Sequence, residues 1–244
     1  MSDAQARAAA FVAARGDALA RARAAAQIGA GSLAAALALL DPRFARGGPD
    51  AWLRVLRVCD ELGARGDARV ERACAEIAAA QRDDGGFACA GDLDARLVYT
   101  GRAAGLLAKT PFARPELLES AGDFLARHFT PERVQGFRYE SLAAYALFFA
   151  NAPHAESDAV LQWCGRELER GFRARAFDAV RTACVYAGCD AHAMPGARIA
   201  HDELRAALRA EQSADGGFGL VVAPAEERVE ATLEALVALR HFRI

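Results

Sequence analysis

Two stretches of the chain share the pattern Q-x-x-D-G-G-F: Gln81-Arg82-Asp83-Asp84-Gly85-Gly86-Phe87 and Gln212-Ser213-Ala214-Asp215-Gly216-Gly217-Phe218. Each stretch follows one helical pattern of apolar residues and precedes another. A glycine at the end of a helix can adopt the left-handed conformation that closes it. We therefore expect at least one glycine of each turn to have a positive φ, and the phenylalanine to pack between neighbouring helices. A turn repeated in this way is typical of helical-repeat proteins.

Weaker copies of the turn lie at Gln135-Gly136-Phe137, at Gly171-Phe172 and at Asp41-Pro42-Arg43-Phe44. The five phenylalanines are 43, 50, 35 and 46 residues apart, which is the length of a two-helix unit. The spacing predicts one domain over residues 1–244. It comprises N-terminal helices within 1–30 and five repeats at approximately 31–63, 68–107, 114–151, 156–189 and 198–242.

The two helices of each repeat differ in their apolar pattern. The first carries apolar residues at helical spacing with charged residues between them, as in Val70, Cys74 and Ile77. The second is more uniformly apolar, over 50–63, 94–107, 140–150, 178–188 and 230–241. We expect the first helices to form an outer ring and the second helices an inner ring. The predicted fold is an all-α, α/α toroid of about five to six helix pairs.

The composition favours helices and excludes several classes of partner. Alanine, the best helix former, supplies 61 of the 244 residues, and aromatics only 8%. The 30 basic and 32 acidic residues nearly cancel, so nucleic acid is not an expected partner. Only Lys109 among the basic residues is a lysine, which we interpret as a compositional bias. No apolar run is long enough for a transmembrane segment, and the N-terminus lacks the apolar core of a signal peptide. With six cysteines expected to stay reduced, the predicted location is cytoplasmic.

The two Q-x-x-D-G-G-F copies, each followed by an Ala-rich helix, resemble the repeats of the prenyltransferase and squalene-oxidase repeat family. That family includes squalene–hopene cyclases, class II diterpene cyclases and protein prenyltransferase β-subunits. In weaker form the resemblance covers residues 31–241, and it implies the α/α toroid. The glycine turn is structural in that family, so an activity has to be argued from the site residues.

Each predicted second helix opens with an acid followed by a small residue: Asp50-Ala51, Asp94-Ala95, Glu140-Ser141, Asp178-Ala179 and Glu230-Ala231. One interpretation is helix capping, because an acid in the first turn accepts free N–H groups and complements the helix dipole. The other concerns the segment Gly91-Asp92-Leu93-Asp94-Ala95-Arg96. Class II terpene cyclases carry D-x-D-D at this place in a repeat. The resemblance therefore assigns Asp94 to the proton donor and Asp92 to its assisting acid.

The segment departs from that motif at its third acid, where the chain has Ala95. An acid that protonates a carbon–carbon double bond needs neighbours that position its proton and stabilise the charge left behind. Asp92 could meet this need alone, or Arg96 could stabilise the conjugate base. An ordinary two-acid helix cap explains the same residues.

Substrate-binding candidates come from the same predicted helices. They are Arg96, the aromatic residues Trp52, Tyr99, Tyr145, Phe148 and Tyr186, and the acid Glu230. Aromatic rings can stabilise a carbocation or line an isoprenoid pocket, and they can equally be plain core. The arginines near the acids (Arg96, Arg138, Arg175, Arg181 and Arg228) could hold a diphosphate, or they could form local ion pairs.

No metal or cofactor is expected. Protein prenyltransferases bind zinc partly through a histidine of a later repeat, and this chain has Glu230-Ala231-Thr232 at the corresponding place. Cys184, Cys189 and His192 form C-x4-C-x2-H, which is not a common structural zinc spacing. The sequence also lacks a glycine loop of the kind that binds phosphates.

Two functions remain open from the sequence. The first is a terpene cyclase-like enzyme that starts the cyclisation of an isoprenoid or similar apolar substrate by protonation from Asp94. The second is a non-catalytic toroid module that binds a hydrophobic ligand or a partner protein. A deep apolar pocket with Asp94 in its wall favours the enzyme. A centre filled by Trp52, Tyr145 and Phe148 favours the module.

Overall fold

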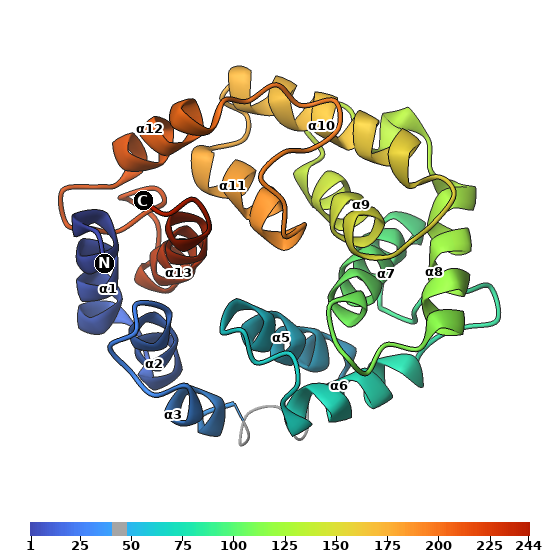
Figure 1. Cartoon of the computed structure of the whole chain (residues 1–244), viewed down its shortest axis with the longest axis horizontal. Coiled ribbons are helices and arrows are strands. Elements are labelled where there is room, and N and C mark those ends of the chain that lie inside the picture. Colours follow the sequence, from blue (N-terminus) through green and yellow to red (C-terminus); the bar gives the residue numbers. More distant parts are fainter. Residues whose placement is uncertain (41–47) are drawn as a thin grey trace. The chain divides into compact units, whose positions relative to one another are not determined.

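Alternating amphipathic and apolar helical segments fold as helices throughout the computed structural model, which describes residues 1–40 and 48–244 (Figure 1). These residues form twelve α-helices and the short 3-10 helix η1 (Pro131–Arg133), and they include no strand. The predicted all-α class is confirmed. The weak turn copy at Asp41-Pro42-Arg43-Phe44 lies outside the described residues.

The helices follow the predicted pairs closely. The N-terminal helices are α1 (Asp3–Arg15) and α2 (Ala18–Gln27), and α3 (Leu33–Ala38) lies in the predicted repeat 31–63. The predicted first helices of the later repeats are α6 (Ala68–Ala78), α8 (Pro115–His128), α10 (Ser157–Arg173) and α12 (His201–Glu211). The predicted second helices are α5 (Pro49–Glu61), α7 (Leu93–Ala108), α9 (Tyr139–Asn151), α11 (Ala179–Gly188) and α13 (Ala225–His241). α13 begins five residues before the predicted start at 230, directly after Pro224, whose φ of −52° suits the residue before a helix.

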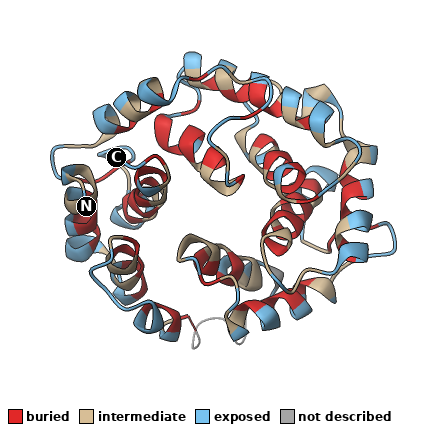
Figure 2. Ribbon diagram, viewed as in Figure 1, coloured by how far each residue is buried: buried red, intermediate tan, exposed pale blue. Residues whose placement is uncertain are grey.

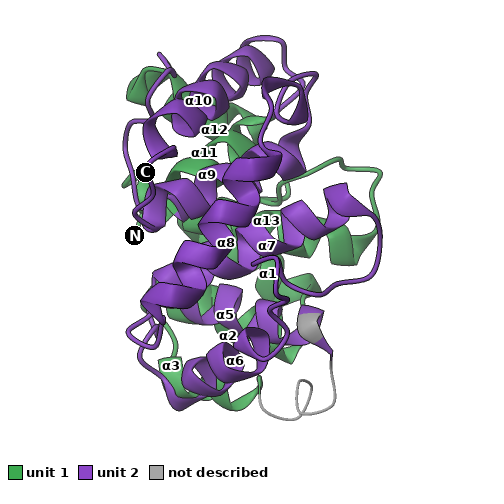
Figure 3. Ribbon diagram, turned by 90° about the vertical axis from the view of Figure 1, so that its right-hand side faces the viewer, with its two compact units in different colours: residues 1–45, 178–187, 199–244 green, residues 46–177, 188–198 purple. Residues whose placement is uncertain are grey.

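The chain divides into two compact units (Figure 3). Unit 1 comprises residues 1–45, 178–187 and 199–244, and unit 2 comprises residues 46–177 and 188–198. In unit 1, α13 packs against α1, α2 and α12, and α2 also packs against α1 and α3. In unit 2, α7 packs against α5, α8 and α9, while α9 also packs against α8 and α10, and α5 against α6.

Burial follows the difference between first and second helices that the sequence predicts (Figure 2). Nine of the sixteen residues of α7 are buried, whereas α6 buries only Val70, Ala73, Cys74 and Ile77, along one face. No helix among the described residues is long and apolar enough to cross a membrane.

The glycines of the two repeated turns have the predicted backbone conformation. Gly85 has φ +92° and Gly216 has φ +87°, which confirms the expected positive φ. A Cβ atom at Gly85 would lie 2.0 Å from the carbonyl oxygen of Ser120, and one at Gly216 would lie 2.5 Å from that of Arg7. Both the backbone conformation and the close approach of a neighbouring helix therefore require glycine.

The two turns bind their neighbouring helices through the same contacts. Nε2 of Gln81 donates to a carbonyl of its own turn and to the carbonyl of Leu117 in α8, at 2.9 Å. Nε2 of Gln212 donates likewise to its own turn and to the carbonyl of Ala4 in α1, also at 2.9 Å. Within unit 1, α1 therefore takes the place beside its turn that α8 takes in unit 2.

The phenylalanine of each turn is fully buried, as the sequence predicts. Phe87 and Phe218 are both 0% exposed. The N–H of Phe87 donates to the hydroxyl of Thr100 in α7, and that of Phe218 to the hydroxyl of Thr232 in α13, each at 3.0 Å. Each turn is thus held to the helix that comes next in the sequence, α7 or α13.

The aspartate of the second turn gives unit 1 a defined acid sensitivity. Two hydrogen bonds from the Arg228 guanidinium, at 2.8 and 2.9 Å, lower the pKa of Asp215 from 3.8 to about 2. A carboxyl whose pKa is lower in the folded state contributes stability that is complete above its unfolded pKa and is lost as the pH falls through the folded value. We expect the urea midpoint of the wild-type protein to fall between pH 4 and pH 2 more steeply than that of Asp215→Asn. Equal slopes for the two proteins would contradict this assignment.

Candidate functional site

Asp92 is the N-cap of α7. Its Oδ1 accepts a hydrogen bond from the backbone N–H of Ala95 at 2.9 Å. Asp178 plays the same part for α11, where it accepts from the N–H of Arg181 at 2.7 Å. For these two acids the geometry is that of helix capping.

Asp94 lies in the first turn of α7 and contacts two arginines. Its Oδ1 accepts a hydrogen bond from Arg133 in η1, and its Oδ2 lies 3.5 Å from Nη1 of Arg138. The side chain of Asp94 is 51% exposed. Two guanidinium groups from outside α7 therefore already contact this carboxylate, and half of its side chain faces solvent. The geometry is that of a surface ion pair.

Arg96 points to the glycine turn. Its guanidinium forms an ion pair with Asp84, donates through Nε to the carbonyl of Phe87 at 3.3 Å, and lies 4.7 Å above the ring of Phe124 in α8. Arg228 makes the corresponding ion pair with Asp215 in unit 1 and lies 4.7 Å above the ring of Phe11. The arginine therefore belongs to the repeated turn, where it joins the aspartate to a ring of the neighbouring helix, α8 in unit 2 and α1 in unit 1.

The aromatic candidates of α9 lie in the packed interior of unit 2. Tyr145 is 2% exposed and Phe148 is 0% exposed. The ring of Tyr145 stacks on Phe149 at 6.2 Å and meets Phe129 edge-on at 5.2 Å, while Phe148 meets Phe149 edge-on at 5.0 Å. These contacts are those of core residues.

Tyr99 and Trp52 have different surroundings. Tyr99 in α7 is 6% exposed, and burial raises the pKa of its hydroxyl. That buried hydroxyl has no hydrogen-bond partner among the described residues. Trp52 in α5 is half-buried, and the guanidinium of Arg72 lies 5.5 Å from its ring centre.

Tyr186 and Glu230 belong to unit 1, whereas the seven other predicted site residues belong to unit 2. Tyr186 is 3% exposed and meets the ring of Phe242 edge-on at 6.1 Å. Glu230 is the sixth residue of α13, so the predicted place in the first turn of a helix is wrong. Its Oε2 lies 3.1 Å from Nη1 of Arg23, an arginine of α2 that is 1% exposed and that no local sequence pattern selects.

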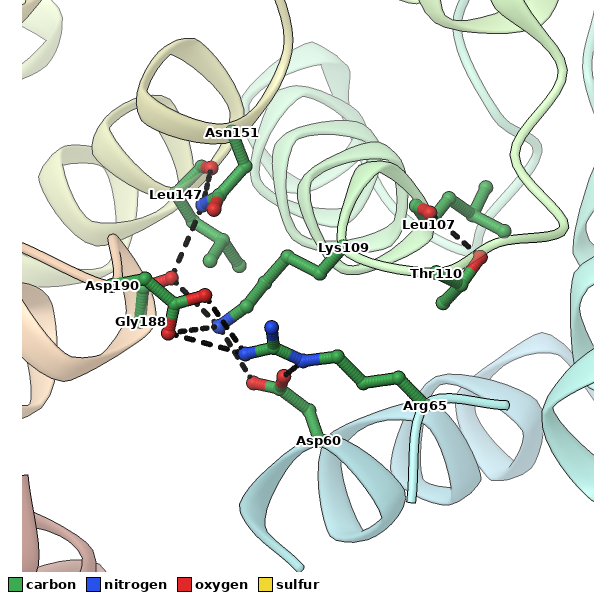
Figure 4. Close-up of polar contacts among 9 residues, drawn as sticks. All are labelled: Asp60, Arg65, Leu107, Lys109, Thr110, Leu147, Asn151, Gly188 and Asp190. Atoms are coloured by element: carbon green, nitrogen blue, oxygen red, sulfur yellow. Dashed lines mark hydrogen bonds and ion pairs between the residues drawn. The ribbon is translucent and has the colours of Figure 1, made fainter. Parts of the chain in front are cut away.

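The single lysine of the chain is the buried centre of an ion cluster in unit 2 (Figure 4). The side chain of Lys109 is 2% exposed. Its Nζ lies 2.8 Å from Oδ2 of Asp60 and 3.3 Å from Oδ1 of Asp190, and it donates to the carbonyl of Gly188 at 3.0 Å. Arg65 also binds both aspartates, through Nε to Asp60 at 2.6 Å and through Nη2 to Asp190 at 2.8 Å.

This lysine cluster, made of Asp60, Arg65, Lys109 and Asp190, lies where two helices of unit 2 end. Lys109 is the C-cap of α7, and Asp60 is in the last turn of α5. Cations are favoured at helix C-termini, and the two cations balance the two carboxylates. Because the amine of Lys109 already contacts two carboxylates and a carbonyl, the cluster is suited to holding the ends of α5 and α7 together.

A cavity of about 400 Å³ lies between α6, α7 and α8 in unit 2. Its lining consists of Glu71, Cys74, Ala75, Ala78, Ala79, Leu107, Phe112, Ala113, Arg114 and Leu117. The lining is mostly apolar, with one carboxylate and one guanidinium at exposed positions. Burial raises the pKa of the Cys74 thiol, which disfavours the reactive thiolate. None of the residues predicted from the sequence as site residues lines this cavity.

Among the residues that the structure describes, no group of three or more His, Cys, Asp or Glu side chains is arranged to hold a metal ion. All six cysteines are free thiols. The Sγ of Cys189 donates to the carbonyl of Ala146 at 3.5 Å.

No protein-family model matches the chain, and comparisons with curated proteins and with solved structures found no significant match either.

Proposed function

We propose that the chain is a non-catalytic helical-repeat module that binds a hydrophobic ligand. The observation that carries the proposal is the environment of Asp94, whose carboxylate is paired with Arg133 and Arg138. A second acid that could hold a proton on Asp94 is missing at Ala95, and Asp92 is engaged as a helix cap. The segment that resembles the cyclase motif therefore lacks the surroundings that proton donation requires.

We further propose that the helix pairs form an α/α toroid of the prenyltransferase and squalene-oxidase repeat type. In a closed ring, the last repeat has to dock on the first. The contacts of α1 support this arrangement, because α1 receives the turn before α13 as α8 receives the turn before α7. The packing of α2 on α13 likewise corresponds to that of α9 on α7. On this proposal α1 and α2 form the pair that follows α13.

The cavity between α6, α7 and α8 is the proposed binding site. Its volume of about 400 Å³ lies within the usual range for small-molecule sites, roughly 300–1,000 Å³. Its alanine, leucine and phenylalanine side chains suit an apolar chain, such as an isoprenoid. The proposal includes no cofactor, metal or nucleic-acid partner, and it keeps the cytoplasm as the location, where the six thiols stay reduced.

Titration with farnesol, an isoprenoid alcohol, tests the binding proposal. Ala75 lines the cavity and is exposed, so Ala75→Trp should cover the cavity without disturbing the core. We expect saturable binding by the wild-type protein in isothermal titration calorimetry, and at least a tenfold weaker affinity for Ala75→Trp. Ala159→Trp, at an exposed position of α10 that does not line the cavity, is the control and should bind as the wild type does. Absence of saturable binding, or equal binding by Ala75→Trp, would refute the assignment.

Acid-initiated cyclisation is the competing function, and Asp94→Asn separates the two. We expect no cyclised product from squalene or a prenyl diphosphate with either the wild type or the variant, analysed by gas chromatography after phosphatase treatment where needed. The variant should lose at most about 1 kcal/mol of stability, because ion pairs of half-exposed side chains are weak. A product formed by the wild type and lost in Asp94→Asn would establish the cyclase instead.

A further inference from the structure

Three consecutive aliphatic side chains stand out from unit 1 between the second turn and α13. Leu220, Val221 and Val222, here called the apolar tip, are 76%, 70% and 92% exposed. The corresponding loop after the first turn has Cys89-Ala90-Gly91 and is one residue shorter between its phenylalanine and its arginine. Single exposed aliphatic residues are common, but adjacent ones with polar neighbours mark an interaction surface.

We propose that the apolar tip of one molecule inserts into the cavity between α6, α7 and α8 of a second copy. This inference rests on the proposed function, which assigns that cavity as the binding site. The side-chain carbons of the tip fill roughly 300 Å³ at about 30 Å³ each, the share of a liquid water molecule. The cavity offers about 400 Å³ behind small alanine side chains, which allow a loop to approach closely.

Charged residues of opposite sign lie beside the tip and in the lining of the cavity. Glu226 and Glu227 follow the tip in the first turn of α13, both exposed, and their carboxylates have no ion pair among the described residues. Arg114 lines the cavity, and its exposed guanidinium likewise has no ion pair there. The single acid of the cavity, Glu71, is exposed and can stay in water. Insertion of the tip would bring the carboxylates of α13 towards Arg114.

The two surfaces differ, so the contact is head-to-tail. After one tip has entered one cavity, the pair still has a free tip and a free cavity. Association should therefore rise with protein concentration, and it gives a ring where the contacts close and an open chain where they do not.

Sedimentation velocity with two complementary variants tests the inference. Val222→Asp places a charge in the apolar tip and leaves the cavity, while Ala75→Trp covers the cavity and leaves the tip. We expect the wild-type protein to self-associate as concentration rises, and each variant alone to associate at least tenfold more weakly. An equimolar mixture of the two variants should form a dimer and stop there, because only one working tip and one working cavity remain. Ala206→Asp, which adds the same charge at an exposed position of α12, is the control and should associate as the wild type does.

A wild-type protein that stays monomeric, or a mixture of the variants that does not associate, would overturn the inference. Self-association that Val222→Asp abolishes and Ala75→Trp leaves intact would also overturn it, because the tip would then dock elsewhere. Farnesol titration of Val222→Asp keeps the two proposals distinguishable. If this variant binds farnesol while the wild type does not self-associate, only the self-association fails. If no protein binds farnesol, the proposed function fails.

Discussion

Replacing Phe218 with alanine is expected to lower the free energy of unfolding by about 3–5 kcal/mol, the usual cost of truncating a fully buried phenylalanine. The ring is 0% exposed, and the backbone N–H of the same residue holds the turn to Thr232. Phe87→Ala should cost about the same, because Phe87 is equally buried and makes the same contact with Thr100. Urea denaturation measures both losses.

The control for this prediction lies two residues away. Leu220→Ala removes aliphatic carbon from a side chain that is 76% exposed and should change stability by no more than about 0.5 kcal/mol. We also expect Phe218→Ala to keep the farnesol affinity of the wild type at temperatures where it is folded. An unchanged unfolding free energy together with lost binding would mean that the repeated turn belongs to the binding site.

Lys109→Met is expected to destabilise the protein by about 3 kcal/mol, the lower end of the range for breaking a buried ion pair. The variant keeps an unbranched side chain and removes the amine that two carboxylates and the Gly188 carbonyl share. The loss stays near the lower limit because Arg65 still binds Asp60 and Asp190. Arg127→Met, which removes a cation from an exposed position of α8, is the matched control and should stay within about 0.5 kcal/mol of the wild type.

A double-mutant cycle makes the second prediction specific to the lysine cluster. Asp60→Asn combined with Lys109→Met should cost less than the sum of the two single variants, because each single change already breaks the ion pair between Asp60 and Lys109. Strict additivity, or a Lys109→Met protein as stable as the wild type, would show that the ion pairs do not hold these helix ends together.

Local sequence signals predicted most of the helices. The glycine turns, the buried phenylalanines and the alternation of amphipathic and apolar helices depend on residues close together in the sequence. The structure bears these out at Gly85, Gly216, Phe87 and Phe218. The start of α13 was missed because the predicted loop after Phe218 was too long, which also put Glu230 at the wrong place in its helix.

Contacts between distant residues escaped prediction. The lysine cluster joins Asp60 to Asp190, and no local pattern selects either aspartate. The one available signal was that Lys109 is the only lysine among thirty basic residues. A compositional bias explains why lysine is rare, but it does not explain why the one lysine is at position 109. The partners of Asp94 were missed for the same reason, because Arg133 approaches it from a different helix pair. The cavity between α6, α7 and α8 likewise depends on how three helices pack.

The burial of Lys109 also determines how residues 1–244 respond to amine-directed chemistry. Their only side-chain amine is 2% exposed and bound by two carboxylates and a carbonyl, so acylating reagents and lysine-modifying enzymes meet no accessible target among these side chains. Lys109 becomes reactive only when unit 2 opens around it. The rate at which a mild acylating reagent modifies Lys109 therefore reports how often unit 2 opens. Peptide mass spectrometry can follow this modification without an introduced label.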